Sequence, residues 1–191
     1  MFEKWLNKPE KYQEENNRII ISADGKTDFF VDPALNAIMS NAPLYMTEIK
    51  GDFSFSCKVK PLFKAKYDAG AVMLYIDDYN WIKFAFEKTD LGYPAVVSVL
   101  TKDYSDDCNG EEISSESIYL KISRKEGLTG LYYSLDGISW KMKRLCRFVG
   151  NYYKSLFLGI EAQSPVGEGC EVEFSEMKLV NIAVDNFRVG V

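Results

Sequence analysis

The 191-residue sequence contains no histidine. This absence excludes Ser-His-Asp and Cys-His nucleophilic catalysis, histidine-ligated zinc or iron, and a histidine that changes charge near neutral pH. Any reaction at this protein would have to use carboxylates or lysine. The sequence is equally compatible with a protein that binds a ligand without transforming it.

Long apolar runs, basic blocks and paired cysteines are also missing. Without a signal-peptide stretch or 18 consecutive apolar residues, we expect neither secretion nor a membrane partner. A net charge of −5 disfavours a nucleic-acid partner. The four scattered cysteines, which form no C-x-x-C pair, are typical of reduced thiols. We therefore expect a cytoplasmic protein, and the sequence predicts no cofactor and no metal site.

Alternation of apolar and polar residues dominates what is present. In residues 53–60 the odd positions are apolar and the even positions are polar, as in a strand with one wet face. Residues 77–80 and the Asp136-Gly137 pair each join two apolar runs, which is typical of a hairpin. About a dozen such strands predict an all-β chain folded as a two-sheet antiparallel β-sandwich.

The whole chain, residues 1–191, is expected to form a single domain of this kind, with residues 1–17 as an N-terminal arm. A helical turn or two is compatible only with residues 5–16 and 147–154. We expect the acidic segment 103–112 to be a mobile loop.

Two strands and one neighbouring tyrosine present an unusual set of outward side chains. The core sets of residues 81–87 and 156–163 are apolar, which leaves aromatic, amide and charged side chains on the opposite face. The predicted ligand-binding residues are Tyr75, Trp81, Lys83, Glu87, Glu161 and Gln163.

A flat aromatic ring beside amide and carboxylate groups suits a sugar, whose ring face is apolar and whose hydroxyls need polar partners. Trp81 would supply the stacking surface, while Glu161 and Gln163 would orient the hydroxyls. The alternative is that the aromatics pack beneath a terminal strand or long loop, with Lys83 paired to Glu87 or Glu161.

One carboxylate run invites a glycosidase hypothesis, since such enzymes use two carboxylates that flank the scissile bond. Glu171, Glu173 and Glu176 resemble the E-x-D-x-x-E run of laminarinase-type hydrolases, but with glutamate at the middle position. An outer strand face explains this run better. We therefore predict no catalytic residue.

Several runs of the sequence together resemble a known family over nearly the whole chain. They are residues 27–30 (TDFF), 68–75 (DAGAVMLY), 80–83 (NWIK), 133–140 (YSLDGISW) and 163–165 (QSP). The chain resembles the concanavalin A-like domain family of unknown function that includes the yeast regulation-of-enolase protein and YesU-type bacterial proteins.

The resemblance implies a lectin/glucanase jelly roll whose concave sheet carries Trp81, Lys83 and Gln163. Two functions follow as hypotheses. The first is a non-catalytic module that binds a carbohydrate or small polar ligand. The second, implied by the family's name, is an intracellular interaction protein that regulates a metabolic enzyme.

Overall fold

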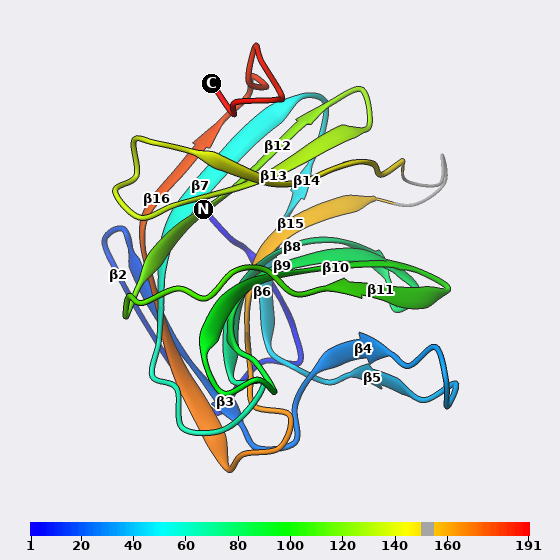
Figure 1. Cartoon of the computed structure of the whole chain (residues 1–191), viewed down its shortest axis with the longest axis vertical. Helices are drawn as coiled ribbons and strands as arrows, with labels where there is room; N and C mark the ends of the chain where they lie inside the picture. Colours follow the sequence, from blue (N-terminus) through cyan, green and yellow to red (C-terminus); the bar gives the residue numbers. More distant parts are fainter. Residues whose placement is uncertain (150–154) are drawn as a thin grey trace.

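The computed structural model describes residues 1–149 and 155–191, and its two large sheets face each other across one core (Figure 1). Sheet A contains, in spatial order, β1 (Lys4–Leu6), β6 (Leu44–Ile49), β15 (Leu156–Gln163), β8 (Ala69–Asp77), β9 (Asn80–Lys88), β10 (Pro94–Lys102) and β11 (Tyr104–Cys108). Sheet B contains β14 (Lys141–Arg147), β13 (Leu128–Ser134), β12 (Ile118–Lys125), β7 (Phe53–Pro61), β16 (Gly169–Val180), β3 (Arg18–Asp24) and β2 (Lys11–Glu15). A third, small sheet pairs β4 (Phe29–Val31) with β5 (Ile38–Ser40).

Neighbouring strands are antiparallel, so the predicted two-sheet antiparallel sandwich is confirmed. Both predicted hairpins are present: β8 turns into β9 at residues 77–80, and β13 turns into β14 around Asp136-Gly137. Gly137 adopts a φ of 76°, a left-handed conformation that glycine reaches without steric cost. Among the described residues there is no helix long and apolar enough to cross a membrane.

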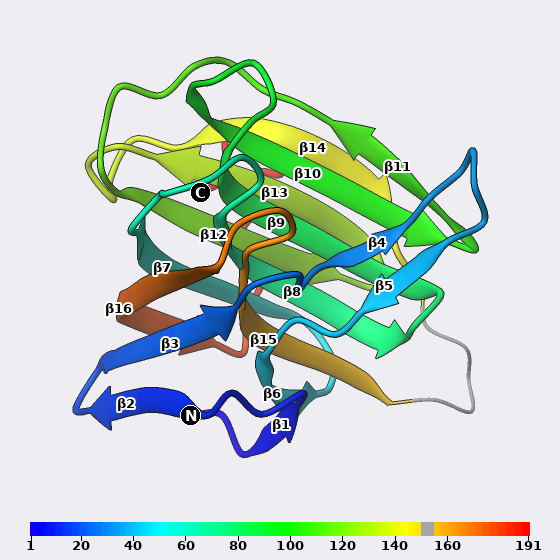
Figure 2. The same ribbon diagram turned by 90° about the horizontal axis from the view of Figure 1, so that it is seen from below.

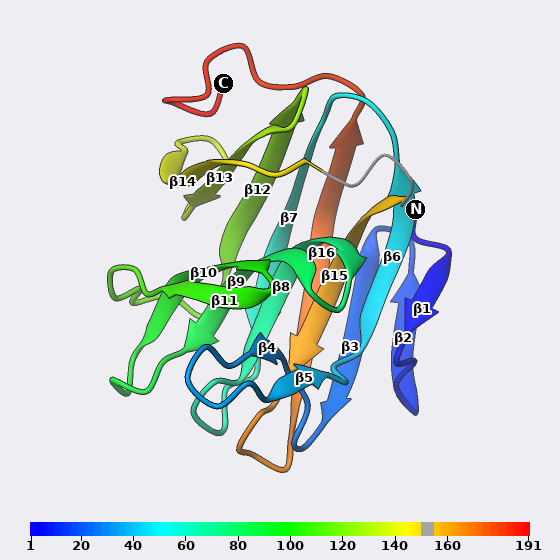
Figure 3. The ribbon, with the colours of Figure 1, turned by 90° about the vertical axis from the view of Figure 1, so that its right-hand side faces the viewer.

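The main core lies between the sheets, where the strand alternation places it (Figure 3). Phe53, Phe55, Cys57 and Val59 of β7 are completely buried there, and they meet apolar side chains of β8, β9 and β15. Burying each large apolar side chain contributes about 1.5–3 kcal/mol. This core fixes which face of each strand is left for other uses.

The N-terminal residues form strands, so the helical turn allowed for residues 5–16 is wrong. β1 pairs with β6 and β2 pairs with β3, which satisfies backbone groups that would otherwise be exposed on those strands. The Trp5 ring stacks on Tyr45 with 4.3 Å between ring centroids. In the other segment, 147–154, Arg147 ends strand β14, and residues 150–154 lie outside the described residues.

The acidic segment 103–112 is not simply a loop, because half of it is strand β11, paired with β10. Asp103, with a φ of 66°, reverses the chain between the two strands. The Ser105 hydroxyl lies 2.8 Å from that of Thr101 and attaches the returning strand to β10.

A second layer covers the outer face of sheet A. Residues 27–42, which include the β4–β5 hairpin, cross this face (Figure 2). Phe29 packs there in a second apolar cluster with Trp81, Ala71 and Ala85. Strands β8 and β9 are therefore buried on both faces.

Candidate functional site

The strand register brings the predicted site residues onto one face of three adjacent strands, β15, β8 and β9. Gln163, Ala69 and Glu87 form one cross-strand row. Glu161 lies in the next row with Ala71 and Ala85. Because the intervening alanines are small, the polar side chains on the flanking strands have room to extend toward one another.

The aromatic end of this face is closed. Trp81 is completely buried, and Phe29 from β4 packs edge-on against it with 6.1 Å between ring centroids. The indole Nε1 of Trp81 donates to the carbonyl of Asp78, and the half-buried Tyr75 donates its hydroxyl to the Asp78 carboxylate. Trp81 offers no ring face to a ligand in this structure, so the expected stacking surface is absent there. The packing alternative describes these two aromatics.

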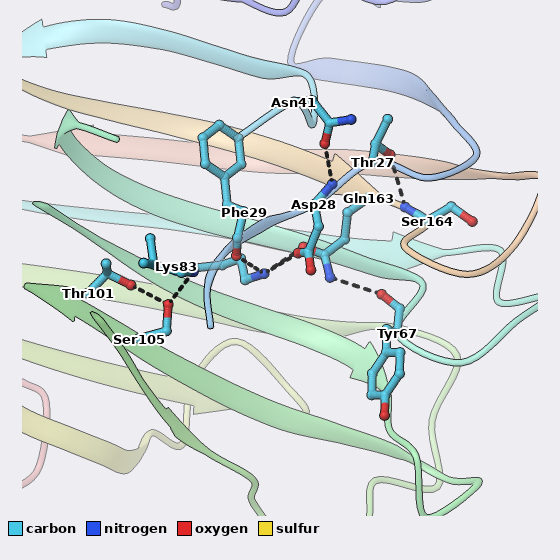
Figure 4. A network of polar contacts seen from close by, with 11 residues as sticks. Thr27, Asp28, Phe29, Asn41, Tyr67, Lys83, Thr101, Ser105, Gln163 and Ser164 are labelled. Atoms are coloured by element: carbon cyan, nitrogen blue, oxygen red, sulfur yellow. Dashed lines mark hydrogen bonds and ion pairs between the residues drawn. The ribbon is translucent and has the colours of Figure 1, made fainter. Parts of the chain in front are cut away.

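Lys83 fastens the covering segment to the sheet (Figure 4). Its ammonium donates to Asp28 Oδ1 at 2.9 Å, to the Phe29 carbonyl at 2.8 Å and to Gln163 Oε1 at 2.7 Å. An ammonium has three N–H groups, so these acceptors use all of them. Gln163 in turn donates its amide to the Tyr67 carbonyl at 3.0 Å.

The charge of Lys83 is fixed as well as its position. Its side chain is only 3% exposed, and burial alone would lower its pKa. The negative charge of Asp28, joined by those of Glu161 and Glu87 once these ionise at higher pH, outweighs burial, so the net shift of the pKa is upward. Lys83 is therefore a permanent ammonium and not a free amine nucleophile.

Further contacts hold the covering segment at both ends. Ser164 of the segment after β15 donates its N–H to the Thr27 hydroxyl at 3.2 Å. Ser105 of β11 accepts a hydrogen bond from the Val31 N–H at 2.9 Å. Asn41 accepts from the Asp28 N–H at 3.0 Å, which joins the two ends of residues 27–42.

Two buried glutamates lie beside this network without hydrogen-bonding partners among the described residues. Glu161 is 0% exposed and neither of its carboxyl oxygens has a partner. Glu87 is 7% exposed. Burial raises the pKa of each to about 8, against the lowering effect of Lys83. Both are therefore mainly protonated at neutral pH.

A cavity of about 370 Å³ opens beside Lys83 and Glu87, and we call it the Lys83 pocket. It is lined by Asp28, Phe30, Tyr67, Lys83, Glu87, Asp90, Val99, Asp107, Asn109, Gln163, Pro165 and Val166. Three predicted site residues, Lys83, Glu87 and Gln163, are in this lining. Of the others, Glu161 lies in the adjacent row, and Tyr75 and Trp81 lie under the covering segment.

Sequence reasoning missed five polar residues of the pocket: Asp28, Tyr67, Asp90, Asp107 and Asn109. All except Asp107 lie outside the regular strands of the two main sheets, and strand alternation says nothing about where such side chains point. Tyr67 has one further distinction, a φ of 66°, which is rare for a bulky residue and is found where surrounding structure enforces it.

A larger hollow of about 700 Å³ lies elsewhere, between β3, the 164–170 segment and Lys64. Glu171, from the suggested glycosidase run, is at its rim and exposed. Glu173 is engaged in an ion pair with Arg18 at 2.6 Å, and Glu176 accepts a hydrogen bond from Tyr119. The three carboxylates thus have ordinary surface surroundings on sheet B.

The fold and sequence have relatives among known proteins. The structure is similar to that of a functionally unknown protein from Saccharomyces cerevisiae, with a TM-score of 0.87, 27% identity, and coverage of 96% of this chain and 97% of that one. It shares its fold with a legume lectin-like domain from Entamoeba histolytica (TM-score 0.62, 11% identity, 94% and 90% covered). It also matches 33% of a GH43 protein from Bacillus licheniformis (TM-score 0.70, 14% identity, 86% of this chain).

In sequence, the chain is 28% identical over 179 residues to Regulation of enolase protein 1 of Saccharomyces cerevisiae, which covers 92% of this chain and 87% of the yeast protein. The lectin-like and GH43 neighbours show the lectin/glucanase type of sandwich and nothing about activity. The predicted family is confirmed: the model for the family described as protein of unknown function (DUF1349) matches residues 5–182, and the chain belongs to that family.

Proposed function

We propose that this protein is a non-catalytic binding module that takes a small hydroxylated ligand, of the saccharide class, in the Lys83 pocket. The observation that carries this proposal is a cavity of about 370 Å³ lined by carboxyl, amide and tyrosine side chains. Its size is at the lower end of the range of about 300–1,000 Å³ typical of small-molecule sites. Sugar hydroxyls both donate and accept, which matches such a lining.

The ring that a sugar would contact is Tyr67 rather than Trp81. Tyr67 is partly exposed and lines the pocket, and its backbone is held by the Gln163 amide and by a hydrogen bond from its N–H to the Lys88 carbonyl. An aromatic side chain whose backbone is fixed loses little freedom when it packs on a ligand.

The protonation states of the two buried glutamates do not suit a hydrolysis that uses them as a pair. A glycosidase needs one protonated and one ionised carboxyl group across the scissile bond. Here burial raises the pKa of both Glu87 and Glu161 to about 8, so neither is an ionised nucleophile at neutral pH. Lys83 has no free N–H or lone pair to contribute.

Ligand-observed NMR with a panel of saccharides at millimolar concentration tests this function. We expect binding by at least one saccharide, weakened in Tyr67→Ala and Glu87→Gln. Glu171→Gln, an exposed position on the other sheet, is the matched control and leaves binding unchanged. Absence of binding across the panel would overturn the proposal.

A second candidate function is regulation of a metabolic enzyme through direct contact. It is favoured by the similarity to a relative named Regulation of enolase protein 1 over 92% of the chain. Titration of the purified protein against enolase, followed by analytical ultracentrifugation, tests this alternative. A complex supports it, and two species that sediment independently at micromolar concentrations argue against it.

A further inference from the structure

The donor groups of the Lys83 pocket are largely committed to the protein itself. Lys83 is the single cationic side chain among the lining residues that the structure describes. Its three N–H groups are used by Asp28, Phe29 and Gln163. The Gln163 amide donates to the Tyr67 carbonyl. A ligand in the pocket therefore meets mainly acceptors.

The acceptors are carboxyl groups in excess of the available cation. Four acidic side chains line the pocket, Asp28, Glu87, Asp90 and Asp107, and Asp28 alone forms an ion pair with Lys83. Arg144 also acts on the charge of Asp107, but that side chain is paired with Asp106 at 3.3 Å.

Glu87 is independent evidence that the pocket can accept a hydrogen-bond donor from a ligand. It is 93% buried, it lines the cavity, and it has no hydrogen bond or ion pair to any described residue. A carboxyl group in such surroundings is less stable than one that is hydrogen-bonded. A donor supplied by a ligand would remove that cost.

A metal ion does not fit this arrangement. Across residues 1–149 and 155–191, no three acidic or thiol side chains converge closely enough to hold one. Carboxyl groups distributed around a cavity of this size instead match a larger organic cation, which combines a charged N–H donor group with hydroxyl groups that hydrogen-bond at other places.

We propose that the preferred ligand of the Lys83 pocket carries a protonated primary amine among its hydroxyl groups, as a 2-amino sugar does, with the ammonium held by Glu87 and Asp107. This inference rests on the proposed saccharide-binding function and specifies its ligand. Neutral sugars bind more weakly because they cannot offset the carboxylates. Anionic sugars are repelled by Asp90 and Asp107.

Ammonium binding is coupled to the ionisation of Glu87. Lys83 on the same strand, Asp28 of the covering segment and Asp107 of β11 act on that carboxyl group. Asp90 and Tyr67 from the adjoining loops and Glu161 from β15 interact with it as well. At neutral pH it holds a proton, which an arriving ammonium displaces because a positive charge favours the ionised form. Binding therefore releases a proton.

Isothermal titration calorimetry at about pH 7 tests the inference with glucosamine, galactosamine and mannosamine against glucose, galactose, mannose and glucuronate. We expect at least one amino sugar to bind about tenfold or more tightly than its neutral parent. Repeating the titration in phosphate and in MOPS, whose ionisation enthalpies differ and neither of which carries a primary amine, should show release of a proton. In Glu87→Gln both the preference and the proton release are lost.

The outcomes separate the two proposals. Equal affinity for amino and neutral sugars, or tightest binding of glucuronate, overturns the cationic ligand but leaves saccharide binding intact. No binding of any sugar overturns both. If Glu87→Gln does not fold, Asp107→Asn at an exposed position is expected to reduce the amino-sugar preference, and an unchanged preference there counts against the inference. Glu171→Gln is the control in every arm.

Discussion

Replacing Glu161 by glutamine should change how the stability of this protein depends on pH. Glu161 is completely buried, has no hydrogen-bonding partner among the described residues, and has its pKa raised to about 8 by burial. In the unfolded chain the same group has a pKa of about 4.3. Between these values the folded protein keeps a proton that the unfolded chain releases. The free energy of unfolding contributed by Glu161 is therefore fully present below about pH 4.3 and is lost as the pH rises toward 8.

The slope follows from proton linkage alone. One proton retained only in the folded state lowers the free energy of unfolding by about 1.4 kcal/mol for each pH unit. Glu87, with a pKa also raised to about 8 by burial, adds a second contribution of the same sign. Glu161→Gln removes one of the two contributions. It also introduces a buried amide without partners, at a pH-independent cost of about 1–3 kcal/mol.

We therefore expect Glu161→Gln to be less stable than the parent protein at about pH 4, the two stabilities to cross between about pH 5 and 6.5, and the variant to be the more stable of the two at about pH 8. Urea unfolding monitored by tryptophan fluorescence measures both curves, since Trp81 is buried in the folded state. Glu171→Gln should run parallel to the parent. Parallel curves for Glu161→Gln as well would refute the reasoning, because they would mean that Glu161 is already ionised in the folded protein.

Three further substitutions test the architecture around the pocket by urea unfolding. Lys83→Met leaves the carboxylate of Asp28 without its partner and should lower the free energy of unfolding by about 3–5 kcal/mol. The control Lys60→Met removes a surface ion pair and should change the free energy of unfolding by less than about 1 kcal/mol. Equal effects of the two substitutions would show that Lys83 does not hold the covering segment on the sheet. Trp81→Ala should lower the free energy of unfolding by about 3–5 kcal/mol, as expected for a buried aromatic side chain. A decrease below about 1 kcal/mol would mean that the Trp81 ring is exposed to solvent. Tyr67→Gly should be more stable than Tyr67→Ala by about 1 kcal/mol, because only glycine adopts a φ of 66° without strain. The reverse order would mean that the backbone at position 67 is not strained.

Much of the site could be predicted because side chains in a strand alternate with a period of two. That rule placed Lys83 and Glu87 on the same face of β9, and it placed Glu161 and Gln163 on the matching face of β15. It also identified the opposite face as core, which the complete burial of Phe84 confirms.

The rule could not show what covers that face. Residues 27–42 have only two three-residue strands, and the contact between Asp28 and Lys83 spans 55 positions of the sequence. A signal was present in β8, where both faces are apolar (Ala69, Ala71 and Met73 as well as Val72), since a strand with two apolar faces is typically covered on both.

Because the chain has no histidine, lysine and arginine are the only side chains that could neutralise the acids of the Lys83 pocket. Lys83 is committed to holding the covering segment, so the pocket retains acids without a neutralising base. A ligand that brings a positive charge to Glu87 lowers the pKa of that carboxyl group. It therefore opposes the loss of stability that Glu87 causes as the pH rises. A cationic ligand should consequently stabilise the protein more at about pH 8 than at about pH 5, whereas a neutral sugar of the same shape should stabilise it nearly equally at both. Binding, protonation and stability are thus coupled through one carboxyl group, and the coupling depends on the positive charge of the ligand.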